Sequence, residues 1–181
     1  MYVYGGDTGS GGKTGLLEIY DLQGDSWVSG SFPAMGASRS HFGHTALDGI
    51  LYAFGGEGAG GAALSSAEQY DPSRNTWSSV AGLPFALKGA LCLCESGRCL
   101  LFGGERSNGR MSDQILCFDP RENRWRILDT VLPFGARDMS GCVTRHSWSH
   151  AGTTMEEEFC LIGGGYDGTT LRSDFRRFYL R

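Results

Sequence analysis

Apolar positions along the chain form short runs that are separated by turn-forming residues. In one stretch the runs cover residues 40–47, 50–54, 66–70 and 76–80, and runs of this length bounded by turn signals are typical of β-strands. Asp48-Gly49 joins the first two runs and is a strong signal for a two-residue hairpin. No apolar run is long enough to span a bilayer. The pattern therefore predicts an all-β chain built as an antiparallel meander.

This strand pattern repeats, and three kinds of marker shift together along the chain. An apolar strand that ends in two glycines recurs at intervals of 50, 48 and 60 residues, and an aromatic residue, followed by Asp in the first three repeats, recurs at the same intervals. A Trp follows in the first three repeats, at intervals of 50 and 48. The markers are Gly5, Gly6, Gly55, Gly56, Gly103, Gly104, Gly163 and Gly164, then Tyr20, Tyr70, Phe118 and Phe178, and finally Trp27, Trp77 and Trp125.

The order of these markers, at a period near 50 residues, resembles the kelch repeat. The resemblance covers essentially the whole chain and implies a β-propeller with four-stranded antiparallel blades. Close backbone approach or positive φ explains a glycine pair, and the Tyr and Trp side chains are large enough to fill the space between blades. The fourth repeat departs from the pattern, because Tyr179 stands where Asp is expected and the chain stops before any Trp.

The repeats divide the chain into a partial kelch propeller. The first repeat starts at its second strand and the fourth ends inside its third, so about three and a half blades are expected. An open arc would expose blade faces and strand edges. Three explanations stay open: a fragment of a longer protein, two copies that close one ring as a homodimer, or a small four-bladed ring. The expected blades are residues 1–30, 31–82, 83–131 and 132–181.

Composition narrows the classes of partner. Glycine makes up 29 of 181 residues, without the period of collagen, and the net charge is −4. A negative chain argues against a nucleic-acid or anionic-membrane partner. The six cysteines stand mostly in or beside apolar strand patterns, and no secretory leader pattern is present. Free thiols and a reducing compartment, cytoplasmic or nuclear, are therefore expected.

The loops between the second and third strands are the first candidates for a binding surface. They cover residues 7–15, 57–63, 105–112 and 165–170, and they are rich in glycine and polar residues. Strand direction alternates within a blade, so these loops share one face with the connections between blades. Variable polar loops on a rigid scaffold suit partner binding. Candidate binding residues in these loops are Lys13, Glu57, Glu105, Arg106, Arg110, Tyr166 and Asp167.

A second periodicity concerns basic residues. Arg39, Lys88 and Arg137 are separated by 49 and 49 residues, and a propeller would place them around one mouth of its channel. Folding each blade about its first hairpin brings Arg39 opposite Glu57 and Lys88 opposite Glu105. One interpretation is a set of structural ion pairs that fix the loops. The other is a basic ring that captures an acidic peptide, in which case replacing Arg39 would impair binding more than stability.

Metal sites and catalysis are poorly supported by the sequence. His41 and His44 fall on a predicted strand with opposite orientations, and Cys92, Cys94 and Cys99 lack a fourth ligand. Residues 146–158 read as an insertion, either a surface loop or a separate docking element, on the face opposite the candidate loops. Kelch-type oxidases of galactose require a cluster of tyrosines, histidines and a Cys–Tyr crosslink around copper, and no matching cluster occurs.

The resemblance therefore implies a non-enzymatic module that binds a protein or peptide partner, such as a scaffold or a substrate-recognition propeller. No catalytic residue, metal or cofactor is expected. The alternative is a fragment of a kelch-fold enzyme such as a galactose-oxidase-like protein.

Overall fold

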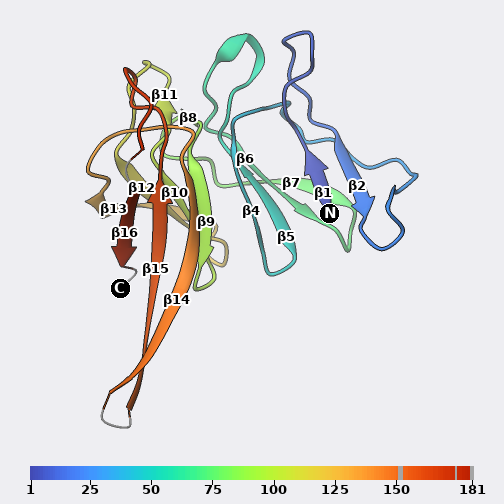
Figure 1. The fold of residues 1–181 in the computed structure, drawn as a ribbon. Helices are drawn as coiled ribbons and strands as arrows, with labels where there is room; N and C mark the ends of the chain where they lie inside the picture. Colours follow the sequence, from blue (N-terminus) through green and yellow to red (C-terminus); the bar gives the residue numbers. More distant parts are fainter. Residues whose placement is uncertain (151–152, 174, 180–181) are drawn as a thin grey trace.

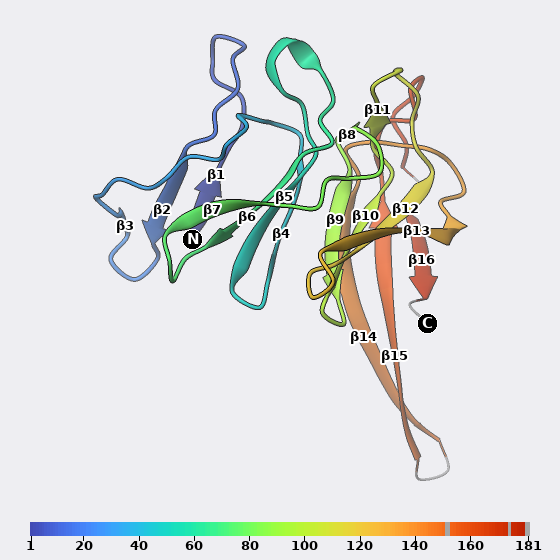
Figure 2. The same cartoon turned by 180° about the vertical axis from the view of Figure 1, so that it is seen from behind.

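Four antiparallel β-sheets of the chain lie side by side as the blades of an open arc (Figures 1 and 2). The computed structural model describes residues 1–150, 153–173 and 175–179. Within these residues the regular structure is almost entirely strand, with one short 3₁₀ turn, η1 (Ala59–Gly61). The expectation of an all-β, partial propeller with four-stranded blades is confirmed.

The sheets contain three, four, four and three strands in chain order. Blade 1 holds β1 (Tyr2–Tyr4), β2 (Leu17–Asp21) and β3 (Ser26–Trp27). Blade 2 holds β4 (Gly43–Leu47), β5 (Ile50–Phe54), β6 (Ala67–Asp71) and β7 (Thr76–Val80). Blade 3 holds β9 (Leu91–Glu95), β10 (Arg98–Phe102), β12 (Gln114–Asp119) and β13 (Arg124–Val131). Blade 4 holds β14 (Ser140–His150), β15 (Thr153–Gly163) and β16 (Phe175–Tyr179), and a small sheet pairs β8 (Leu87–Lys88) with β11 (Glu105–Arg106).

Two-residue hairpins set the register of the inner strands in blades 2 and 3. Asp48 and Gly49 have φ of 51° and 80°, and Ser96 and Gly97 have φ of 47° and 74°. Positive φ at both central residues defines a type I′ turn, whose twist matches that of the strands. The Asp48-Gly49 hairpin expected from the sequence is confirmed.

The glycine pairs bring each blade against the next one. Gly55 has φ of +61°, and a Cβ there would lie 2.5 Å from the carbonyl oxygen of Leu87, which is too close for any side chain. This approach lets the following residue, Gly56, donate its N–H to the same carbonyl at 2.8 Å. Gly6 and Gly104 make the equivalent bonds, to Arg39 and Ala136, at 2.8 and 2.7 Å.

In the fourth repeat the glycine pair stands one residue later than the sequence predicted, at Gly164 and Gly165 in place of Gly163 and Gly164. Gly164 and Gly165 have φ of 71° and 103°, whereas Gly163 lies in β15 and pairs with Ser140. The carbonyl of Gly165 accepts the N–H of Arg172, as the second glycine does in each other repeat. Three consecutive glycines had made the two alignments equivalent in sequence.

Aromatic side chains fill the space between neighbouring blades. Phe54 of blade 2 lies with its ring centroid 5.3 Å from that of Phe118 and 5.0 Å from that of Trp125, both in blade 3. Trp125 also donates its indole N–H to the carbonyl of Ala81, in the connection from blade 2, at 2.7 Å. Trp77 does the same to Pro33 at 3.0 Å. The aromatic markers of blades 2 and 3 thus lie in the interfaces between blades, as the sequence suggested.

The face of blade 1 that points away from blade 2 has no neighbour in the described chain. Met1 is 57% exposed and Trp27 is 54% exposed, whereas the residues equivalent to Met1 in blades 2 to 4, Leu51, Cys99 and Cys160, are buried. The other end of the arc differs in composition. The position of Phe54 in blade 2 is occupied by Gly163 in blade 4.

Residues 146–150 and 153–158 do not form the separate surface loop that the sequence predicted. They extend β14 and β15 into one long hairpin that projects away from the face bearing β8 and β11 (Figures 1 and 2). Residues 151 and 152 and the side chains of this extension lie outside the described part, so its docking role stays a hypothesis. Continuous pairing from Ser140 to His150 overrides the turn signal that polar residues gave.

The two tryptophans at equivalent positions provide a matched stability test. Trp125→Ala removes an interblade ring and its hydrogen bond, and we expect a loss of about 3 kcal/mol in the free energy of unfolding. Trp27→Ala removes an exposed ring, and a loss below about 1 kcal/mol is expected. Urea unfolding followed by circular dichroism measures both. Equal losses would show that Trp27 is packed like its counterparts.

Candidate functional site

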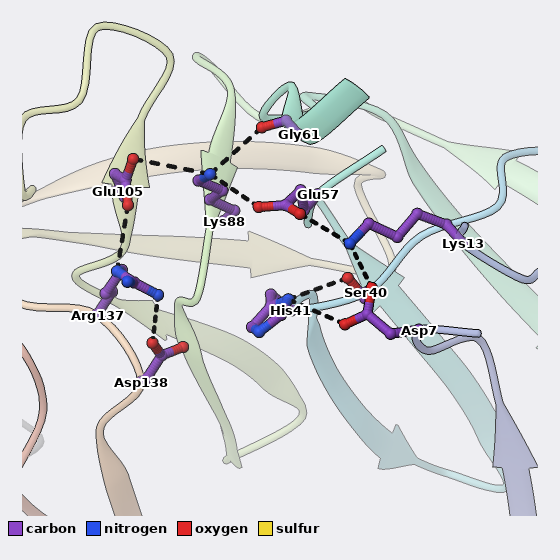
Figure 3. A network of polar contacts seen from close by, with 10 residues as sticks. All are labelled: Asp7, Lys13, Ser40, His41, Glu57, Gly61, Lys88, Glu105, Arg137 and Asp138. Atoms are coloured by element: carbon purple, nitrogen blue, oxygen red, sulfur yellow. Dashed lines mark hydrogen bonds and ion pairs between the residues drawn. The ribbon is translucent and has the colours of Figure 1, made fainter. Parts of the chain in front are cut away.

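The loops between strands and the connections between blades meet on one face, where charged side chains alternate in sign. The backbone sets their spacing, because Ser40 pairs with Glu57, Lys88 with Glu105, and Arg137 with Tyr166 across antiparallel bridges. The sheet β8–β11 therefore holds Lys88 directly opposite Glu105, as expected. Figure 3 shows the resulting row of side chains.

The row runs from blade 1 to blade 4 through ion pairs. Lys13 contacts Asp7 and lies 2.7 Å from a carboxylate oxygen of Glu57. The other oxygen of Glu57 is 2.8 Å from the Lys88 ammonium. Glu105 then lies 3.7 Å from Lys88 and 3.1 Å from the guanidinium of Arg137, which also contacts Asp138 at 2.6 Å. These ion pairs link all four blades.

Glu57 is the centre of this row. Hydrogen bonds from Lys13 and then Lys88 lower the pKa of its carboxyl group to about 2. Hydrogen bonding to Lys13 also lowers the pKa of Asp7, and the bond to Asp7 raises the pKa of Lys13. Asp7, Lys13 and Glu57 are therefore charged at neutral pH, so the row carries charges of both signs.

Arg39 does not belong to this row, and its expected contact with Glu57 is wrong. Its side chain is completely buried and donates to the carbonyl oxygens of Gly55 and Ser66 at 2.7 and 2.9 Å. Its Nη2 lies 2.6 Å from Glu68 Oε1. Burial lowers the pKa of Arg39, and Glu68 acts in the opposite direction. Arg39 therefore fastens the connection between blades 1 and 2.

A register difference of one residue explains the error. The second glycine of each pair donates its N–H to a carbonyl of the next blade. Gly6 donates to Arg39, Gly56 donates to Leu87, and Gly104 donates to Ala136. Arg39 is thus the counterpart of Leu87, and Ser40 is the counterpart of Lys88. The equal intervals of 49 residues concealed a shift. The sequence analysis did not identify Glu68. The available signal was its position, because it is a carboxylate in a predicted strand at a place that faces the core.

The remaining candidate residues lie on the same face but have different local roles. Arg106 stacks over Phe85, 3.9 Å from the ring centroid, and donates to Gln114 at 2.5 Å. Arg110 is exposed at the tip of its loop. The Tyr166 hydroxyl donates to the carbonyl of Gly168 at 2.9 Å. Asp167 accepts from the backbone N–H groups of Thr169 and Thr170, which lowers its pKa.

Two histidines at the start of β4, His41 just before it and His44 within it, are only weak metal candidates by sequence. His41 has φ of 49°, and its Nδ1 lies 3.0 Å from Ser40 Oγ and 3.8 Å from a carboxylate oxygen of Asp7. His41 and His44 both line a groove beside β1. Among the described residues, no group of three or more His, Cys, Asp or Glu side chains is arranged to hold a metal ion.

Comparison with known proteins assigns the chain to a family. Residues 1–164 match the family described as the KLHDC2/KLHL20/DRC7 Kelch-repeats domain, so the chain belongs to the kelch-repeat proteins. It is similar to mouse Kelch-like protein 35 (32% identity over 157 residues, 86% of this chain and 25% of that protein). It is also similar to alpha-scruin of Limulus polyphemus (27% identity over 130 residues, 68% of this chain and 14% of that protein).

Similarity to mouse Kelch-like protein 38 is comparable, with 32% identity over 135 residues, 73% of this chain and 23% of that protein. The chain thus spans about a quarter or less of the length of these relatives. No helix among the described residues is long and apolar enough to cross a membrane.

The burial of Arg39 leads to a stability prediction that distinguishes it from the partly exposed side chains of the charged row. Arg39→Ala leaves the Glu68 carboxylate buried without its cation, and we expect a loss of about 3–5 kcal/mol in unfolding free energy. Arg137→Ala removes partly exposed pairs and should cost about 1 kcal/mol or less. Urea unfolding of both variants measures this. The account is contradicted if Arg39→Ala costs no more than Arg137→Ala.

Proposed function

We propose that the chain is a non-enzymatic binding module that holds a protein or peptide partner on the face formed by its loops. The observation that carries the proposal is the row of alternating charges that crosses all four blades on one exposed face. Rigid blades hold the ends of the loops, while exposed side chains such as Arg110 extend from them. Binding residues are commonly found on loops positioned by such a scaffold. Membership of the kelch-repeat family supports a role in protein interaction.

The charges favour a partner segment that carries both acidic and basic side chains. A purely acidic peptide would have to displace Glu57 and Glu105 from Lys88 and Arg137, and would lose much of the attraction that an unopposed basic ring offers. A mixed segment exchanges ion pairs without leaving charges unpaired. The acidic partner expected from the sequence is therefore refined to a mixed-charge one.

Closure of the ring by a second copy is less well supported than binding of a different partner. Blade 1 presents exposed Met1 and Trp27 at its open end. Blade 4 presents Gly163 where Phe54 fills the corresponding space of blade 2, so this position supplies no ring to pack on Trp27. We also propose a reducing compartment, cytoplasmic or nuclear, which the six free thiols support.

A pair of charge reversals tests the loop face. Arg110→Glu changes the loop face, whereas Arg124→Glu makes the same change at the start of the outermost strand of blade 3, where Arg124 contacts Glu122. We expect Arg110→Glu to weaken binding of a partner identified by crosslinking by about tenfold. Arg124→Glu should leave the affinity unchanged and should cost about 1 kcal/mol or less in unfolding free energy, because it removes an exposed ion pair.

Isothermal titration calorimetry with the purified partner provides the affinities. A similar loss of affinity in Arg110→Glu and Arg124→Glu would place the binding surface elsewhere. Arg137→Glu is a second variant on the loop face, and unchanged affinity in both Arg110→Glu and Arg137→Glu would lead to the same conclusion.

A further inference from the structure

Two cysteines face each other across the inner hairpin of blade 3. Cys94 in β9 and Cys99 in β10 are direct strand partners, and their Sγ atoms lie 3.4 Å apart. In the strand pairs that the structure describes, each of the other four cysteines has a residue of another type opposite it. This hairpin therefore brings together two sulfur atoms in the arrangement from which a disulfide can form.

The hairpin turn places this pair where the backbone suits a disulfide. The type I′ turn at residues 96–97 makes Glu95 and Arg98 a hydrogen-bonded pair. Because the two kinds of pair alternate along antiparallel strands, Cys94 and Cys99 form a non-hydrogen-bonded pair, in which Cα atoms stand about 4.5 Å apart. A disulfide spans Cα separations of roughly 4.4–6.8 Å. The two sulfur atoms can therefore bond without a shift of the strands.

The two thiols differ in their access to solvent. Cys99 is completely buried in the core between blades 2 and 3, in one cluster with Tyr52 and Phe54. Cys94 is half-buried and is the last residue but one of β9, close to the hairpin turn. Its Sγ lies 2.9 Å from the hydroxyl oxygen of Thr45 in blade 2. A small oxidant can therefore reach Cys94 first, while the core shields Cys99.

The surroundings keep both thiols protonated at neutral pH. Hydrogen bonding with Cys99, and then burial, raise the pKa of Cys94, and hydrogen bonding with Cys92 raises the pKa of Cys99. Because the thiolate is the reactive form, attack by these thiols on separate molecules is slow. The closeness of the two sulfur atoms favours instead a bond between them, since the partner is already in place.

We propose that Cys94 and Cys99 form a modification site, at which hydrogen peroxide converts the two thiols into a reversible disulfide. The peroxide O–O bond breaks as one oxygen is transferred to Cys94 Sγ, which becomes a sulfenic acid, and a water is released. Cys99 Sγ then attacks Cys94 Sγ, so that the S–S bond forms and the S–O bond breaks with release of a second water. The thiols together lose two electrons and two protons, and the peroxide is reduced to two waters.

The disulfide is reversible because small thiols such as glutathione reduce it by exchange and are themselves oxidised to their own disulfide. In a reducing compartment the pair therefore rests as thiols, and a disulfide there is a transient record of oxidation. The site lies at the opposite end of β10 from Glu105 and the charged row (Figure 1). It is independent of partner binding on the loop face.

Peptide mapping by mass spectrometry tests the proposal on the full chain. The reduced protein is treated with hydrogen peroxide, its remaining thiols are alkylated, and it is digested with trypsin, which cleaves after Lys88, Arg98 and Arg106. We expect peptides 89–98 and 99–106 to be linked, with a mass about 2 Da below the sum of the two because two hydrogen atoms leave. Fragmentation should place the link at Cys94 and the alkyl group at Cys92, and dithiothreitol should separate the peptides.

Cys92 and Cys94 provide matched serine variants, because both are half-buried and lie two residues apart on one face of β9. Cys94→Ser should lower the yield of linked peptides at least about tenfold, since Leu101 and not Cys99 is the strand partner of Cys92. Cys92→Ser should change the yield less than about twofold. Circular dichroism checks that both variants fold, and fragmentation of the unaltered chain assigns the link in either case.

Three results would overturn the proposal. The first is the absence of linked peptides 89–98 and 99–106 after peroxide treatment. The second is a link that fragmentation places at Cys92, or that Cys92→Ser abolishes while Cys94→Ser leaves it intact. The third is a product that dithiothreitol does not reverse, which would show oxidation of single thiols beyond the sulfenic acid and no disulfide.

Discussion

The structure depends on one close approach, in which two glycines bring the end of a strand against the first carbonyl of the next blade. The contact requires positive φ and the absence of a Cβ, and it produces a backbone hydrogen bond from Gly6, Gly56 and Gly104 to successive blades. Backbone contacts of this kind are insensitive to side-chain identity. The blades therefore keep a constant offset while the residues between them vary.

That constant offset is also what arranges the charges on the loop face. The residue after each glycine pair, such as Glu57 or Glu105, is held at the start of a loop. The residue that opens the next blade, such as Lys88, is held beside it. Lys88 can then contact the carboxylates of two neighbouring loops, Glu57 and Glu105.

Most of the fold could be predicted from the sequence, because the glycine, aromatic and Trp markers report contacts that every blade repeats. Features that differ between blades could not. Arg39 shares its interval with Lys88 but is shifted by one residue, and its side chain lies in the core with Glu68. The run Gly163 to Gly165 offered two equivalent alignments. The long hairpin of β14 and β15 arises from continuous pairing, which composition does not indicate.

The most direct test of the central contact compares two glycines of similar backbone conformation. Gly55 and Gly49 both have positive φ, but a Cβ at Gly49 meets nothing within 4 Å. Both alanine variants incur left-handed backbone strain of about 1–2 kcal/mol. Gly55→Ala also breaks the close approach to Leu87. It should therefore lose at least about 2 kcal/mol more unfolding free energy than Gly49→Ala. Equal losses by urea unfolding would contradict the account.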